Sequence, residues 1–141
     1  TTWRNAELTE VNSGENFSIE QLDKPVLVET FAVWCPTCTR QQQEVQKLHE
    51  MRDDFVSVSL DTDPNEDAEK VRKHTARHSF DWYYAIADPQ VALSLRDEFG
   101  SGVLNPPSVP MILVCEDGDF RRLPNGVKPA SKLSNELDEG C

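Results

Sequence analysis

The chain has 141 residues, a length that predicts one domain able to bury a sizeable core. It carries 14 Lys and Arg against 25 Asp and Glu, a net charge of −11, which argues against nucleic acid and anionic membrane surfaces as partners. No apolar run approaches the ~18 residues of a membrane span. The sequence begins at Thr1 without a charged-then-apolar leader, so a membrane anchor or signal outside these residues stays open.

The first 24 residues are polar with scattered apolar positions, and they predict two short strands, at residues 6–11 and 17–19, joined by a turn. We interpret residues 1–16 as an N-terminal extension and residues 17–137 as the core of a single domain spanning residues 1–141. No internal repeat and no low-complexity linker divides the chain.

The central stretch is residues 26–38, where the apolar run VLVETFAVW leads into the tetrapeptide CPTC. The run is rich in β-branched and aromatic residues and predicts a buried central strand, after which a helical pattern continues to about Met51. The two cysteines therefore fall where a strand gives way to a helix. Partial positive charge and unpaired N–H groups at the helix start favour the thiolate of Cys35, and Pro36 suits the first helical position.

The spacing of Cys35 and Cys38 is that of a dithiol–disulfide exchange pair, because one helical turn brings the second thiol within disulfide range of the first. Cys38, Val45 and Leu48 share one helix face, which turns Cys38 toward the core. We therefore expect Cys35 to be exposed and to attack, Cys38 to be covered and to resolve the mixed disulfide, and the pair to form a redox-active disulfide.

Residues 55–60 alternate in polarity and predict a strand, after which Asp63 and Pro64 predict the start of a helix that runs to about residue 79. We interpret the basic stretch at residues 72–78 as a solvated face. His74 and His78 have the spacing of a metal pair, but no third ligand accompanies them in the sequence, so no metal site is predicted.

The second half of the chain alternates again between strands and helices. It predicts a strand at 82–86, a helix from Asp88 to Gly100, a loop at 101–110, a buried strand at 111–115, a hairpin return at 120–123 and a closing helix at 129–137. This order predicts an α/β fold with a mixed sheet. Cys115 is expected to be a buried structural thiol, and the role of Cys141 stays open between a free thiol and a partner of something outside these residues.

Two segments together resemble the thioredoxin superfamily: FAVWCPTC at residues 31–38 and SVPMILV at residues 108–114. Within the superfamily the chain looks most like the TlpA/ResA branch of extracytoplasmic thiol–disulfide oxidoreductases, because the gap from Cys35 to Pro110 exceeds that of a minimal thioredoxin by about one strand–helix unit. The resemblance implies a thioredoxin-like fold, a central mixed β-sheet flanked by helices. An extra strand–helix insertion, within residues 61–100, would lie between the CxxC helix and a cis-proline.

The resemblance also implies roles for several residues. Val109–Pro110 would be a cis peptide whose backbone lies beside Cys35 and holds an extended substrate. Glu29 matches the buried aspartate of thioredoxins and would accept the proton of Cys38, although strand alternation could instead turn it to a polar edge. Trp34, Pro36 and Thr37 would complete the substrate-binding surface, with Trp34 packed beside the motif and limiting access.

The sequence thus predicts a protein-disulfide oxidoreductase that acts on protein dithiol and disulfide substrates, draws electrons from an upstream thiol donor and uses no cofactor. The resemblance favours a reductase with a role in electron transport, and a monomer. It also favours a periplasmic or cell-surface location and leaves a membrane anchor open. A cytoplasmic location stays open as well, because a CxxC pair also functions there.

Four alternatives remain. The first is a non-enzymatic binding module with this fold, which the presence of both cysteines disfavours. The dipeptide at Pro36 and Thr37 departs from the usual thioredoxin pair and leaves a disulfide-donating oxidant open. A peroxiredoxin-type peroxidase would need a threonine where Ala32 stands. A copper-binding assembly protein of the SCO kind would use a histidine downstream of Pro110, and this chain has none there, although Cu(I) could bind two thiolates.

Overall fold

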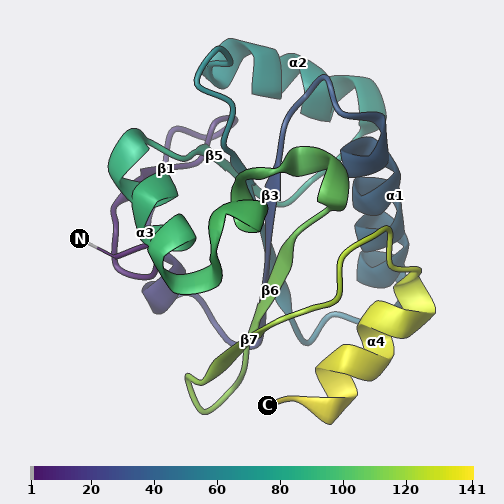
Figure 1. The fold of residues 1–141 in the computed structure, drawn as a ribbon. Coiled ribbons are helices and arrows are strands. Elements are labelled where there is room, and N and C mark those ends of the chain that lie inside the picture. The colour runs from purple at the N-terminus through teal and green to yellow at the C-terminus, as the bar shows by residue number, and fades with distance from the viewer. Residues whose placement is uncertain (1) are drawn as a thin grey trace.

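The computed structural model describes residues 2–141, and its centre is a five-stranded mixed sheet (Figure 1). The strand order is β5-β4-β3-β6-β7. Strands β3, β4 and β5 run parallel, β6 pairs antiparallel with the central strand β3, and β7 pairs antiparallel with β6 at the edge of the sheet. Their bounds are β3 Val26–Phe31, β4 Val56–Asp61, β5 Tyr83–Ile86, β6 Met111–Val114 and β7 Phe120–Arg122. The predicted α/β class and mixed sheet are confirmed.

Helices cover both faces of the sheet, with α1 and α4 on one side and α3 on the other, and a fourth helix, α2, lies at the top of the view (Figure 1). They are α1 Pro36–Met51, α2 Ala68–His78, α3 Pro89–Phe99 and α4 Ala130–Glu139. An N-terminal hairpin of β1 Leu8–Thr9 and β2 Asn16–Phe17 joins the α3 side, and the Val11 N–H donates to the Tyr84 carbonyl across 2.9 Å. None of these helices is both long and apolar enough to cross a membrane, among residues 2–141.

Strand β3 is the middle of the sheet because its side chains are buried on both faces. Val26 and Val28 pack in the cluster that includes α3, whereas Leu27 packs in the cluster formed with α1 and α4. A strand covered on both faces has a continuous apolar run rather than alternation, which is the pattern of this segment. Each such side chain contributes roughly 1.5–3 kcal/mol through burial.

The start of α2 differs from the prediction. The helix begins at Ala68, and its N-cap is Asp67, whose side chain accepts a hydrogen bond from the Lys70 N–H. Asp63 accepts instead from the Asn65 N–H at 2.8 Å. This local bond holds a turn that competes with helix initiation, so the helix starts only after residue 67.

The remaining elements lie close to their predicted positions. The start of α3 is as expected, since Asp88 accepts from the Val91 N–H and the helix ends at Gly100 with a positive φ of 88°. The predicted loop at 101–110 contains two short 3-10 helices, Ser101–Leu104 and Pro106–Ser108.

Cys115 and Cys141 form a disulfide, with 6.0 Å between their Cα atoms. The prediction of a free thiol at Cys115 is therefore wrong, although the residue is buried. The reason is topological, because α4 runs back along the sheet and brings the end of the chain to the end of β6 (Figure 1). The residues around Cys115 contain no sequence signal that the C-terminus lies beside them.

Replacing both Cys115 and Cys141 with Ala is expected to lower the free energy of unfolding by roughly 2–4 kcal/mol. The cross-link closes a loop of 26 residues and so restricts the unfolded chain. Urea denaturation of the variant and the wild type under non-reducing conditions measures the loss. In excess dithiothreitol the two proteins should have nearly equal stability, and a difference that persists there would contradict this entropic origin.

Candidate functional site

The CxxC motif lies between the end of β3 and the first turn of α1. Cys35 is the N-cap residue of α1 and Pro36 takes the first helical position, as predicted. The Cys38 N–H donates to Cys35 Sγ at 3.2 Å, and the Thr37 hydroxyl lies 3.2 Å from the same sulfur. Cys35 and Cys38 are free thiols in this structure. Cys35 Sγ therefore occupies the position at a helix start where backbone and side-chain donors can meet a thiolate.

Both cysteines are buried, so the prediction of an exposed Cys35 is wrong. Cys35 is 0% exposed and Cys38 is 1% exposed. The 3-10 segment Pro106–Ser108 lies against the motif: Cys38 Sγ donates to the Pro106 carbonyl at 3.3 Å, and the Thr37 hydroxyl donates to the Pro107 carbonyl at 3.3 Å. Helix spacing alone could not predict this cover, because the segment is distant in sequence.

The segment at Val109 and Pro110 differs from what the resemblance implies. The peptide bond between them is not cis; the cis bond in residues 2–141 joins Lys24 and Pro25. Val109 adopts the left-handed region at φ 53°, and its N–H donates to the Pro106 carbonyl at 2.9 Å. The isomer of an X–Pro bond depends on tertiary context, which the sequence pattern does not contain.

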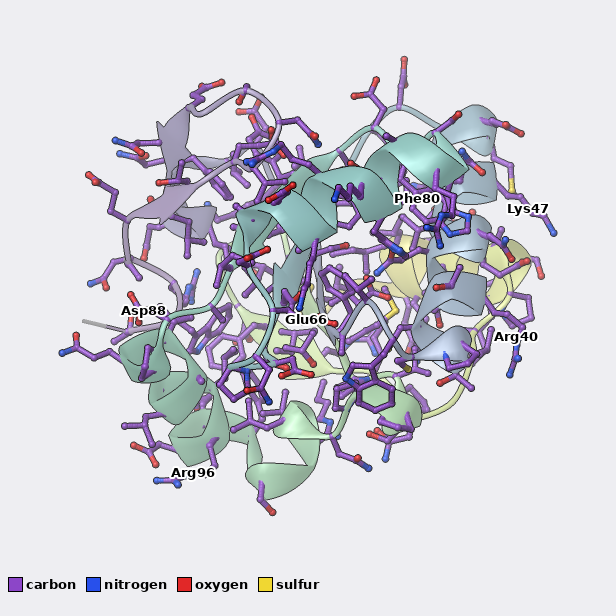
Figure 2. All side chains as sticks on the ribbon, turned by 90° about the horizontal axis from the view of Figure 1, so that it is seen from above. Arg40, Lys47, Glu66, Phe80, Asp88 and Arg96 are labelled. Atoms are coloured by element: carbon purple, nitrogen blue, oxygen red, sulfur yellow. A yellow bond between two sulfur atoms is a disulfide. The ribbon has the colours of Figure 1, made fainter. Side chains whose placement is uncertain are left out.

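The residues that border the motif on its exposed side are Trp34 and Pro36. Trp34 is 56% exposed, and its indole N–H donates to Asp63 Oδ2 at 2.7 Å. The Val33 N–H donates to Glu66 Oε1 at 2.8 Å, and Figure 2 shows Glu66 near the middle of the view, below α2. The turn at residues 63–66 thus fixes the chain just before Cys35, and Trp34 stands as an apolar surface beside it.

Glu29 lies in the core rather than at a polar edge. It is 2% exposed, and Oε1 accepts from Gln42 Nε2 at 2.8 Å and from Ser59 Oγ at 2.9 Å, whereas Oε2 has no hydrogen-bond partner within residues 2–141. Burial raises the pKa of Glu29 from its ordinary 4.5 to about 7, despite the two hydrogen bonds and the nearby Lys128 ammonium. The carboxyl can therefore take up or release a proton near neutral pH.

The charge of Glu29 is one of several influences on Cys38. Burial raises the pKa of the Cys38 thiol well above its ordinary value, and the hydrogen bond with Cys35 and the negative charge of Glu29 raise it further. Cys38 thus remains a thiol at neutral pH unless a base takes its proton as it reacts.

Lys128 is a feature of the site that the sequence did not predict. It is 2% exposed, and its Nζ donates to the carbonyls of Val109 at 3.1 Å, Pro124 at 2.8 Å and Gly126 at 2.6 Å. Burial lowers its pKa to about 8, while the charge of Glu29 opposes that shift. A lysine in a turn is ordinarily solvated, so no sequence signal marked it.

A second group that the sequence missed connects Glu29 to α2. Gln42 Oε1 accepts from the Tyr84 hydroxyl at 2.9 Å and lies 2.7 Å from His74 Nε2. His74 is buried, and desolvation lowers its pKa to about 4, so it is a neutral core residue rather than part of a solvated face. Within residues 2–141, no group of three or more His, Cys, Asp or Glu side chains is arranged to hold a metal ion.

Comparison with known proteins gives the family and the fold. The family model described as Redoxin matches residues 3–136. No curated protein matches the sequence.

Solved structures similar to the chain have the same fold at low sequence identity. A thioredoxin-family thiol:disulfide interchange protein from Chlorobium tepidum has a TM-score of 0.78 and 19% identity over 99% of this chain and 95% of its own. A secreted Mycobacterium tuberculosis disulfide oxidoreductase, homologous to E. coli DsbE, has a TM-score of 0.72 and 16% identity over 95% of both chains. BsSco, of the Sco family of cytochrome c oxidase assembly proteins, has a TM-score of 0.73 and 17% identity over 94% of this chain and 89% of its own.

The mixed sheet with helices on both faces agrees with the fold of these structures. The family match covers nearly the whole chain, from β1 to α4. The chain therefore belongs to the Redoxin family of thioredoxin-fold oxidoreductases.

Proposed function

We propose that the chain exchanges disulfides with protein substrates through Cys35 and Cys38, acting as a reductase. One observation carries the proposal: a helix-capping cysteine accepts a hydrogen bond from the N–H of a second cysteine, and the charge of a buried carboxyl with a pKa near 7 acts on that second cysteine. A nucleophile, a resolving thiol and a base are the three groups that the reaction needs.

The reaction proceeds in two exchanges. The Cys35 thiolate attacks a substrate disulfide, forms a mixed disulfide and releases one substrate thiolate. Cys38 then gives its proton to Glu29 and attacks Cys35 Sγ, which releases the second substrate thiolate and leaves a Cys35–Cys38 disulfide. Two electrons pass to the substrate, and an upstream dithiol donor restores the reduced pair. Because Cys35 is buried, the substrate has to displace groups that cover it.

The substrate surface of this proposal consists of Trp34, Pro36 and Thr37, with Val109 and Pro110 behind the covering segment. The Val109 N–H and carbonyl are bonded to Pro106 and Lys128, so strand-like docking at Val109 requires exchange of these bonds. Trp34 offers the larger exposed apolar surface beside the motif.

The reducing direction is supported by the resemblance of the chain to the TlpA/ResA branch. A strong oxidant owes its potential to a stabilised reduced form, and Cys38 is a buried thiol that contributes no stabilised thiolate. A disulfide donor is the second candidate, since the Cys38 N–H and the Thr37 hydroxyl both lie at Cys35 Sγ, where they can stabilise a thiolate. The copper-binding alternative is supported only by the fold that the chain shares with BsSco.

An extracytoplasmic location, in the periplasm or at the cell surface, is part of the proposal. The Cys115–Cys141 disulfide supports it, because structural disulfides persist in oxidising compartments. The Mycobacterium tuberculosis neighbour is described as secreted.

The Cys38→Ser variant is expected to accumulate mixed disulfides with a disulfide-containing protein substrate, because Cys35 can attack but nothing resolves the product. The Cys35→Ser variant is the matched control and should accumulate none. Non-reducing electrophoresis followed by mass spectrometry of the adduct measures both. Adducts formed only by Cys35→Ser would reverse the two roles.

The reduction potential of the Cys35/Cys38 pair is expected near that of thioredoxin, about −270 mV, as a reductase requires. Equilibration with glutathione or dithiothreitol, followed by mass-tagging of free thiols, measures it. A potential near that of DsbA, about −120 mV, would make the protein a disulfide donor and overturn the proposed direction.

The Glu29→Gln variant is expected to gain stability over the wild type as pH rises from about 4.5 to 7. In that range the unfolded wild type has lost the Glu29 proton while the folded one retains it, so its folded state is progressively penalised. The rise in pKa from 4.5 to about 7 corresponds to about 3 kcal/mol at pH 8 and none at pH 4.

Urea unfolding of both proteins at pH 4 and pH 8 measures this difference, and an equal difference at the two pH values would contradict it. If Glu29 is also the base, the same variant resolves mixed disulfides roughly a hundredfold more slowly. Unchanged resolution would leave Glu29 a structural residue.

A further inference from the structure

A groove of about 370 Å³ adjoins Cys35 between the first turns of α1 and the last turn of α2. Its wall near the motif contains Trp34 and Pro36, and its far wall contains Arg77 and His78. The volume falls within the range of specific ligand sites. Since Cys35 is part of its lining, whatever occupies this groove stands next to the proposed nucleophile.

The groove is basic, in contrast to the chain as a whole. Its lining includes two arginines, Arg40 and Arg77, and no Asp or Glu, and the His74 in its wall is neutral. Helix α2 carries four Lys or Arg and one Glu, whereas the chain has a net charge of −11. The surface beside Cys35 is therefore positively charged, whereas the protein as a whole is negatively charged.

The two arginines of the groove are unengaged. Arg40 and Arg77 are exposed, and neither forms a salt bridge or a side-chain hydrogen bond with any of residues 2–141. Figure 2 shows Arg40 projecting outward from α1. Two acids beside the motif form hydrogen bonds with it rather than ion pairs with these arginines: Asp63 accepts from the Trp34 indole and Glu66 accepts from the Val33 N–H.

We infer that this groove binds an acidic segment of the substrate protein, next to the disulfide that Cys35 attacks; the inference rests on the proposed function. Guanidinium groups pair with carboxylates through two parallel hydrogen bonds, which gives geometric as well as electrostatic selectivity. Trp34 and Pro36 supply an apolar contact for the residues between the acidic segment and the disulfide. The partner is thus a protein with Asp or Glu close to a reducible disulfide.

Two disulfide peptides of the same length test the inference, one with Asp and Glu flanking the cysteines and one with Asn and Gln in their places. With the reduced wild-type protein at low ionic strength, the acidic peptide is expected to be reduced roughly fivefold to tenfold faster, as two charge pairs of ordinary strength predict. The ratio of the two rates should fall toward one as salt is added. Stopped-flow detection of the released thiols gives both rates.

The double variant Arg40→Gln/Arg77→Gln is expected to bring this ratio close to one at low salt. The matched control is Arg96→Gln/Lys132→Gln, which removes the same charge from α3 and α4, outside the groove, and should keep the wild-type ratio. Arg96 lies on α3, away from Arg40 (Figure 2). Circular dichroism confirms that all variants are folded.

The outcomes separate the two proposals. If the wild type reduces neither peptide, the proposed function fails. If it reduces both peptides at equal rates, or if the Arg40→Gln/Arg77→Gln variant keeps the wild-type ratio, the proposed function stands and the acidic-segment inference is overturned. An equal loss in the control variant would assign the effect to net charge rather than to the groove and would also overturn it.

Discussion

The desolvated carboxyl of Glu29 is the constraint on which the rest of the site depends. A carboxylate in the middle of a buried strand opposes folding, and the structure offsets this with two hydrogen bonds to one oxygen and a buried ammonium nearby. The second oxygen has no hydrogen-bond partner within residues 2–141. These interactions offset only part of the desolvation of Glu29, so its pKa stays near neutrality. A group that accepts and releases a proton is most effective when its pKa lies near the working pH.

Lys128 connects this constraint to the covering segment. Its ammonium bonds the Val109 carbonyl, and its charge interacts with Glu29. Gln41 holds the backbone of Lys128 through both its amide oxygen and its amide nitrogen, at 2.7 and 3.0 Å. Helix α1 therefore fixes the lysine, the lysine fixes the carbonyl before Pro110, and the segment Pro106–Ser108 lies over Cys38 as a result. Glu29 and the segment that lies over Cys38 therefore both depend on contacts of Lys128.

Local patterns predicted the fold and the motif well, because strands, helix caps and the CxxC spacing are encoded in neighbouring residues. The apolar run of β3 and the Asp88–Pro89 start of α3 are examples. What the sequence could not predict depends on contacts between distant segments: the burial of Cys35, the Cys115–Cys141 bond and the burial of Lys128 and His74. The wrong start of α2 has a local cause, since the predicted cap Asp63 holds a turn and Asp67 caps the helix instead.

Charge in this molecule acts differently at long and short range. At distances beyond about 10 Å a net charge of −11 repels acidic proteins, although salt screens that repulsion. Next to Cys35, unpaired guanidinium groups attract carboxylates directly, and contact pairs are screened least. A strongly acidic protein would therefore be disfavoured at the encounter, whereas a neutral or basic protein with a short acidic segment beside its disulfide would meet little repulsion and still fit the groove. The acidic surface and the basic groove together favour substrates by where their negative charges lie, next to the disulfide, rather than by their net charge.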